Sequence, residues 1–190
     1  HKYGTQQVRA EWVKVHAMSR LNTNIITAVT ILDKDAADVP QLPGLVKTTV
    51  EGFDVHEVSA DKAYTSTENL QTVEDIGGRL YSPFKRNATG AVGGIFEKAF
   101  HYFNLNRDEF LAHYHKRSNV ESTFSAVKRK MGDSVRGKSD VSMKNEVLAK
   151  IVVYNLSVFI IEWYTLGIQP LFLTEPESGE RDILQLPQRR

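Results

Sequence analysis

Two acidic residues, Asp61 and Glu121, stand where chemistry on phosphate groups would need them. Asp61 directly follows a strand-like stretch, so it lies at the carboxyl end of a strand, where open α/β sheets place their ligands. Glu121 is the single carboxylate in the basic, helix-forming segment 112–132. Two hard oxygen donors beside basic side chains are what a Mg²⁺ site for phosphoryl transfer uses. Plainer interpretations also stand: Asp61 as a strand-ending turn residue, and Glu121 as an ion-pair partner of Arg117 worth a few tenths of a kcal/mol.

The charge surrounding Glu121 is strongly positive, although the whole chain has a formal net charge of only +1. Residues 113–138 contain seven lysines and arginines but only two acidic residues. These cations are Lys116, Arg117, Lys128, Arg129, Lys130, Arg136 and Lys138. Such a cluster attracts a phosphate backbone, and an ordinary solvated helix face is equally compatible with the charge alone.

A helical projection of this segment separates its residues into two stripes. At 100° per residue one narrow stripe holds Tyr114, Arg117, Glu121 and Lys128. The adjacent arc holds the apolar residues Val120, Phe124, Val127 and Met131. The projection therefore predicts that Glu121 lies at the edge of a buried helix face.

The elements that would position these residues change from strands to helices along the chain. A period-two pattern over 7–19, the turn RLNT and a β-rich stretch over 24–32 predict a hairpin. Further strands are predicted at 53–60 and 79–84, with helices inside 38–51 and over 66–76, the latter with Thr67 as its candidate cap. The later part predicts a flexible glycine link at 90–94, helices at 95–103, 108–131 and 143–166, and a polar loop at 133–141. This order predicts an α/β fold with a mixed sheet.

Composition narrows the class of protein further. A chain of 190 residues with 41% apolar residues is most simply one globular domain. It has no cysteine, hence no thiolate metal site, and its beginning does not resemble a signal peptide. The apolar run 147–161 is interrupted by polar residues and is shorter than the roughly 20 residues that span a bilayer, so it predicts a buried helix and no membrane contact.

Four ordered motifs resemble a known family. The segment YHKRSNVESTFSAVK, 114–128, is similar to the Tyr-Arg-Glu-Lys signature of insertion-sequence transposases with a DDE triad, at all four positions and all three spacings. ADKAYTS at 60–66 resembles the motif of the second aspartate. EWVKVH at 11–16 resembles the preceding hairpin strand, and NEVLAKIVVYNL at 145–156 resembles the closing helix. The similarity runs from about residue 9 to 166.

The resemblance implies a ribonuclease-H-like fold in which carboxylates bind two divalent ions, Mg²⁺ or Mn²⁺, for in-line attack on DNA. Asp61 would be the second member of the triad and Glu121 the third, both metal ligands. Lys128 would contact the phosphate backbone, and Arg117 and Tyr114 would contact DNA or brace the glutamate. Arg129, Lys130, Arg136 and Lys138 extend this DNA-binding surface. The expected partners are double-stranded transposon ends and target DNA, with a homodimer as candidate assembly, in a prokaryotic cytoplasm beside the nucleoid.

One member of the expected triad has no counterpart. In this family the first aspartate precedes the hairpin, and the six residues HKYGTQ contain no acid, while Asp33, Asp35 and Asp38 follow the second strand. We therefore expect a truncated catalytic domain over 1–167, lacking its first strand, and a tail over 168–190. Such a fragment is expected to bind metal weakly and to be inactive alone. The alternative is a non-catalytic DNA-binding module derived from a transposase, and a repair or resolvase-type nuclease is a third interpretation.

Overall fold

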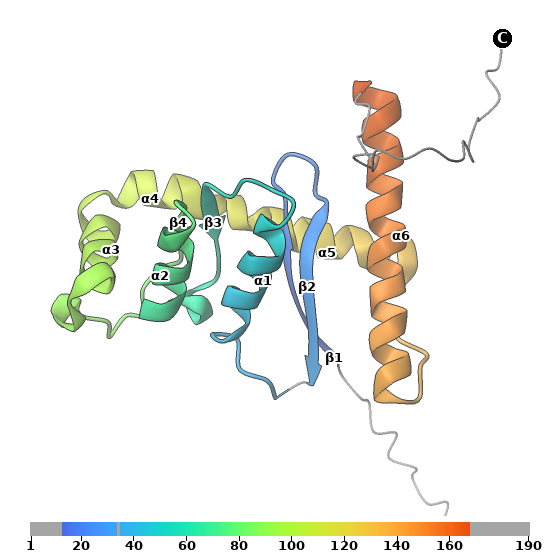
Figure 1. Ribbon diagram of the computed structural model, residues 1–190, viewed down its shortest axis with the longest axis horizontal. Coiled ribbons are helices and arrows are strands. Elements are labelled where there is room, and N and C mark those ends of the chain that lie inside the picture. Colours follow the sequence, from blue (N-terminus) through green and yellow to red (C-terminus); the bar gives the residue numbers. More distant parts are fainter. Residues whose placement is uncertain (1–12, 34, 168–190) are drawn as a thin grey trace, which may run out of the picture.

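The computed structural model describes residues 13–33 and 35–167 (Figure 1). It begins with an antiparallel hairpin of β1 (Val13–Ser19) and β2 (Ile26–Asp33). The turn is closed by a hydrogen bond from Arg20 N to Ile25 O, and Asn24 takes a positive φ of 58°, which asparagine tolerates well. The predicted hairpin is confirmed for these residues; positions 7–12 lie outside the described ones.

A second, parallel sheet is formed by β3 (Glu57–Ser59) and β4 (Arg79–Tyr81). The connection between them carries η1 (Lys62–Tyr64) and α2 (Thr67–Asp75), which makes a strand-helix-strand unit. The cap of α2 is Ser66 rather than Thr67, because the Ser66 hydroxyl accepts from Asn69 N at 3.1 Å. Both strands are shorter than predicted.

The described strands form two separate sheets. β1 pairs with β2 and β3 pairs with β4, giving two two-stranded sheets of opposite type. The α/β class is therefore correct, and the ribonuclease-H-like mixed sheet that lacks its first strand stays a prediction. Hydrophobic pattern fixes which face of a strand is buried, but it does not fix which edges meet.

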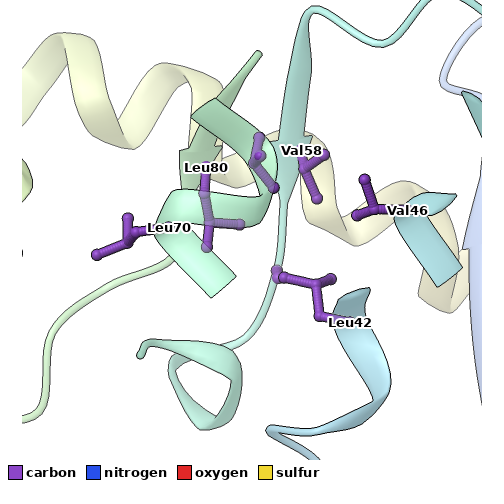
Figure 2. Close-up of a cluster of buried hydrophobic side chains, with 7 residues drawn as sticks. Leu42, Val46, Val58, Leu70 and Leu80 are labelled. Atoms are coloured by element: carbon purple, nitrogen blue, oxygen red, sulfur yellow. The ribbon is translucent and has the colours of Figure 1, made fainter. Parts of the chain in front are cut away.

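The first core joins the parallel sheet to two helices (Figure 2). Leu42 and Val46 of α1 (Gln41–Val50) pack with Val58, Leu70 and Leu80. Val46 is only 1% exposed. Burying one such side chain contributes about 1.5–3 kcal/mol, so α1 holds β3 in place.

The second part of the chain is helical. It contains η2 (Gly90–Val92), α3 (Gly94–Leu105), α4 (Arg107–Tyr114), η3 (His115–Arg117) and α5 (Ser118–Met131). α4 and α5 run on from one another along the back of the molecule in Figure 1. The predicted helix 108–131 is thus interrupted at η3. A 3₁₀ turn has 3.0 residues per turn, so three residues advance the helix face by about 60° more than an α-helix would.

The longest helix is α6 (Asp140–Leu166), which Ser139 caps through Ser142 N. It packs on β2 and α5 through Ile151, Tyr154 and Val158. The expectation of a buried helix was wrong, because several of its large apolar side chains are more than 40% exposed: Val141, Leu148, Val152, Val153, Leu156, Ile160, Ile161, Tyr164 and Leu166. By length and composition alone α6 is able to cross a membrane. Its apolar residues surround the helix, and the described part of the chain packs against one side.

Candidate active site

Asp61 is held by hydrogen bonds at the point where β3 ends. Its backbone carbonyl accepts from Ser82 Oγ at 2.7 Å, and its side chain accepts from Lys62 N at 2.7 Å, capping η1. The neighbouring Ala60 N donates to Tyr81 O, so the parallel sheet extends to the residue before the carboxylate. The Asp61 side chain is 51% exposed. Its backbone and one carboxylate oxygen are held, and about half of the side chain is exposed.

Glu121 lies in the first turn of α5. Its carboxylate is 2.8 Å from Arg117 Nη1 and its side chain is 62% exposed. The prediction that Glu121 borders the buried face was therefore wrong. The buried residues of α5 are Thr123 and Val127.

Arg117 joins the two carboxylates, which are far apart in the sequence. Its Nη1 atom is 4.0 Å from Asp61 Oδ2 as well as 2.8 Å from Glu121 Oε1. The guanidinium lies over the Tyr114 ring, 5.6 Å from its centroid. Burial alone would lower the pKa of Arg117, but Tyr114, Glu121 and Asp61 together raise it. The centre of the site is a permanent cation between two anions.

A buried pair supports the turn that follows Asp61. Tyr64 of η1 lies 2.6 Å from His16 Nδ1, and burial, Asp38 and Asp61 raise the pKa of Tyr64 to about 12. The two atoms share a hydrogen bond whose direction depends on the histidine tautomer. Burial lowers the pKa of His16, and its Nε2 is 3.8 Å from Asp38. Among the described residues that nitrogen has no hydrogen-bond partner.

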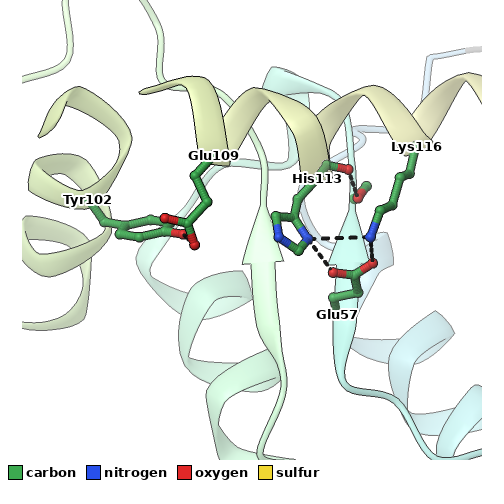
Figure 3. Close-up of polar contacts among 6 residues, drawn as sticks. Glu57, Tyr102, Glu109, His113 and Lys116 are labelled. Atoms are coloured by element: carbon green, nitrogen blue, oxygen red, sulfur yellow. Dashed lines mark hydrogen bonds and ion pairs between the residues drawn. The ribbon is translucent and has the colours of Figure 1, made fainter. Parts of the chain in front are cut away.

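A second polar cluster fastens β3 to α4 and η3 (Figure 3). Glu57 accepts from Lys116 at 2.6 Å and from His113 Nδ1 at 2.5 Å. Ser59 Oγ donates to His113 O at 2.9 Å, and the His113 ring stacks on Tyr81. No sequence pattern indicates this cluster, because Glu57 is 56 and 59 residues away from its two partners.

The remaining cations of the basic segment lie away from the carboxylates. Lys128, Arg129 and Lys130 are exposed in the last turn of α5. The backbone of Lys128 lies about 10 Å along the helix axis from that of Glu121. Arg136 and Lys138 are exposed in the loop before α6, where Glu146 accepts from Arg136 N and Gly137 N. The structure thus brings together Tyr114, Arg117, Glu121 and Asp61. It leaves the five other predicted DNA-binding residues as a separate basic surface.

The donor set suits a hard cation but is small. Mg²⁺ is commonly held by one or two carboxylates together with water and substrate phosphates, and Asp61 and Glu121 are of that type. Both turn their carboxylates to the same guanidinium, so a positive charge already lies between them. Within residues 13–33 and 35–167, no group of three histidine, cysteine or acidic side chains could hold a metal ion together.

Open α/β sheets bind ligands at the carboxyl ends of their strands, and Asp61 lies at such an end beside Arg117. The comparison with protein families gives the class of protein. The family model described as the transposase DDE domain matches residues 1–156, and the chain belongs to that family. Membership places it among proteins of DNA transposition, which generally use divalent metal ions. The searches of curated proteins and of solved structures gave no match.

Proposed function

We propose that this chain is the catalytic part of an insertion-sequence transposase of the Tyr-Arg-Glu-Lys signature group. Its reaction would be metal-dependent cleavage and strand transfer of transposon-end DNA by in-line phosphoryl transfer. The observation that carries the proposal is Arg117, which contacts Asp61 and Glu121 although these two residues come from different elements. If Asp61 only capped η1 and Glu121 only formed a surface ion pair, the two carboxylates would have no reason to lie at the same guanidinium.

In this proposal each residue has a definite task. Asp61 and Glu121 would hold Mg²⁺ or Mn²⁺, which when bound supplies an activated nucleophile and stabilises the leaving 3′-oxygen. Arg117 holds the two carboxylates together, and it would turn to the scissile phosphate once a metal neutralises them. Tyr114 limits that movement, because its ring lies under the guanidinium. The basic surface from Lys128 to Lys138 would bind the phosphates of double-stranded transposon ends and target DNA.

A cleft next to these residues supports the proposal that a further strand, carrying the first aspartate, belongs between the two sheets. The cleft is lined by residues 15–19 of β1 and residues 57–61 at β3. Side chains alternate between the faces of a strand, so five consecutive residues at one cleft mean that the cleft meets the strand's edge. Among the described strands, neither β1 nor β3 has a second neighbour. One inserted strand would make the two sheets continuous, as in a ribonuclease-H-like fold, and would end near Asp61.

The test uses an N-terminally extended protein in which an apolar strand ending in aspartate precedes the chain. We expect Mn²⁺-dependent nicking of supercoiled plasmid by the extended protein and little or none by the 190-residue chain. Asp61→Asn and Glu121→Gln should each lower the rate by about a thousandfold, because each removes a metal ligand. Asp133→Asn is the matched control, since Asp133 is an exposed carboxylate in the same basic segment. Equal nicking by all three variants would show that the site is elsewhere.

The second candidate is a DNA-binding module without chemistry. It is favoured by the two-carboxylate donor set within the described residues. It predicts that DNA binding persists in the extended protein while no metal-dependent nicking develops. The nicking measurement therefore separates the two functions.

The assembly and location follow from the same proposal. We propose a homodimer in the prokaryotic cytoplasm, beside the nucleoid, with no membrane contact. α6 argues against a membrane span, because Asn155 binds both backbone groups of Ile26 in β2 at 2.9 and 2.8 Å. Moving α6 into a bilayer would bring the hairpin with it or leave those backbone groups without partners.

A further inference from the structure

A second basic surface adjoins Asp61, and apart from Lys62, which lies in the motif ADKAYTS, neither the sequence motifs nor the proposed site includes its residues. It is a hollow of about 690 Å³ between η1, the segment that follows β4, and the helices α3 and α4. Four cations line it, namely Lys62, Lys85, Arg86 and Arg107, and its lining contains no acid. All four are exposed, and among the described residues none of them is paired with a carboxylate.

The floor of this hollow is rigid and aromatic. Phe84 packs at right angles to Phe100, with 5.4 Å between ring centroids, and 5.5 Å from Phe103. Arg107 lies over the Phe103 ring at 4.8 Å, so its guanidinium is held in position before any ligand arrives. A preorganised cation loses little side-chain freedom when it binds an anion.

The hollow is also fixed in place relative to Asp61. Ser82, two residues before Phe84, donates to the Asp61 carbonyl at 2.7 Å. Thr65, which follows η1, lies 2.6 Å from Ser82 Oγ and donates to Pro83 O at 2.9 Å. Lys62, which lines the hollow, donates its backbone N–H to the Asp61 carboxylate. Asp61 is therefore bordered by the Arg117 guanidinium of η3 and by the backbone of Lys62 in η1.

We propose that this hollow binds the phosphate backbone of a DNA strand beside the phosphodiester that Asp61 serves. The inference rests on the proposed function for the position of that phosphodiester. Four unpaired cations from three segments suit a chain of phosphates better than a single small anion, which needs one convergent set of donors. The half-buried Phe100 offers an apolar surface for a nucleotide between two phosphates. The basic surface of α5 and this hollow would then contact DNA at separate places.

The test measures binding of a short fluorescein-labelled DNA duplex of mixed sequence to the 190-residue chain by anisotropy, without metal, over a series of salt concentrations. For Lys85→Ala/Arg86→Ala we expect about tenfold weaker binding at 0.1 M salt, and a log–log salt slope smaller by about 1.8, because each lost phosphate contact removes about 0.9. The charge-preserving variant Lys85→Arg/Arg86→Lys should bind like the wild type.

The matched control is Lys47→Ala/Lys98→Ala, which removes two exposed lysines that do not line the hollow. If the two alanine variants bind alike, or if the wild type does not bind DNA, the proposal is wrong. Competition by polyglutamate as strong as by DNA would overturn the assignment of DNA as the ligand. The binding measurement needs no metal, so it tests the hollow independently of catalysis. If the hollow binds DNA but the extended protein does not nick it, the proposed function is refuted and the proposal for the hollow stands.

Discussion

At the scale of single residues, the contacts of Glu57 decide how β3 is held. Burial alone would raise the pKa of Glu57, but hydrogen bonds from Lys116 and His113 lower it below its ordinary value of 4.5. Those partners come from η3 and α4, the elements that lead into Arg117. Glu57 therefore links the strand that carries Asp61 to the helices that carry Arg117 and Glu121 (Figure 3).

This contact predicts a pH-dependent contribution to stability. Because the pKa of Glu57 is lower in the folded than in the unfolded chain, its stabilisation is fully present above pH 4.5 and is lost as pH falls through the folded-state pKa. Glu57→Gln should lower the free energy of unfolding by about 1 kcal/mol at neutral pH, and by less in acid. Urea unfolding at several pH values measures this, with Glu51→Gln, an exposed glutamate, as control. A loss that stays constant with pH would contradict the charge-based explanation.

The candidate site was only partly predictable at this scale. The Arg117–Glu121 contact follows from their spacing of four residues in a helical segment. The approach of Asp61 to Arg117 does not, because it depends on how β3 packs against η3. The pair of His16 and Tyr64 was equally hidden, since 48 residues separate its members. Local spacing reports contacts along one helix, whereas contacts between elements depend on tertiary packing.

At the scale of elements, Asn155 closes part of an open sheet edge. Its side chain accepts from Ile26 N and donates to Ile26 O, which is the pattern a neighbouring strand would supply. The amide of α6 thus takes the place of one residue of a strand at β2. This contact fixes the position of α6 along the hairpin.

The contact makes a specific mutation costly. Asn155→Leu should lower the free energy of unfolding by about 2 kcal/mol, because two partly buried backbone groups lose their partner. Asn145→Leu is the matched control, as Asn145 is exposed on the same helix. Denaturation in urea compares them. Equal losses in the two variants would mean that the amide has no role beyond helix propensity.

At the scale of the whole molecule, strong local signals predicted the elements but not their assembly. The turn RLNT gave the hairpin, and Gly77 at a φ of 77° ends the region of α2 as predicted. The prediction of one helix over 108–131 missed the 3₁₀ turn η3 between α4 and α5, because nothing in the polar pattern of the segment indicates it. The two separate sheets were also unpredictable, since strand pairing joins distant segments and is not encoded in any one of them.

The exposed apolar surface of α6 gives the last prediction, which concerns the assembled state. Val152, Leu156 and Ile160 recur every four residues and are each more than half exposed, so they form one stripe along the helix. Exposed apolar stripes of this kind commonly mark protein interfaces. We expect the chain to form a homodimer through α6, and light scattering after size exclusion should give twice the mass of 21.5 kDa at high concentration.

Leu156→Glu/Ile160→Glu should convert this dimer to a monomer, because two charges would then be buried on each side of the contact. Leu105→Glu is the control, since Leu105 is 80% exposed at the end of α3, away from the stripe. Thermal unfolding of the monomeric variant should remain cooperative, because Leu156 and Ile160 are exposed in the single chain. A wild-type monomer at every concentration would rule out the dimer. Flotation of the wild type, but not of the double variant, with lipid vesicles would instead assign the stripe to a membrane surface.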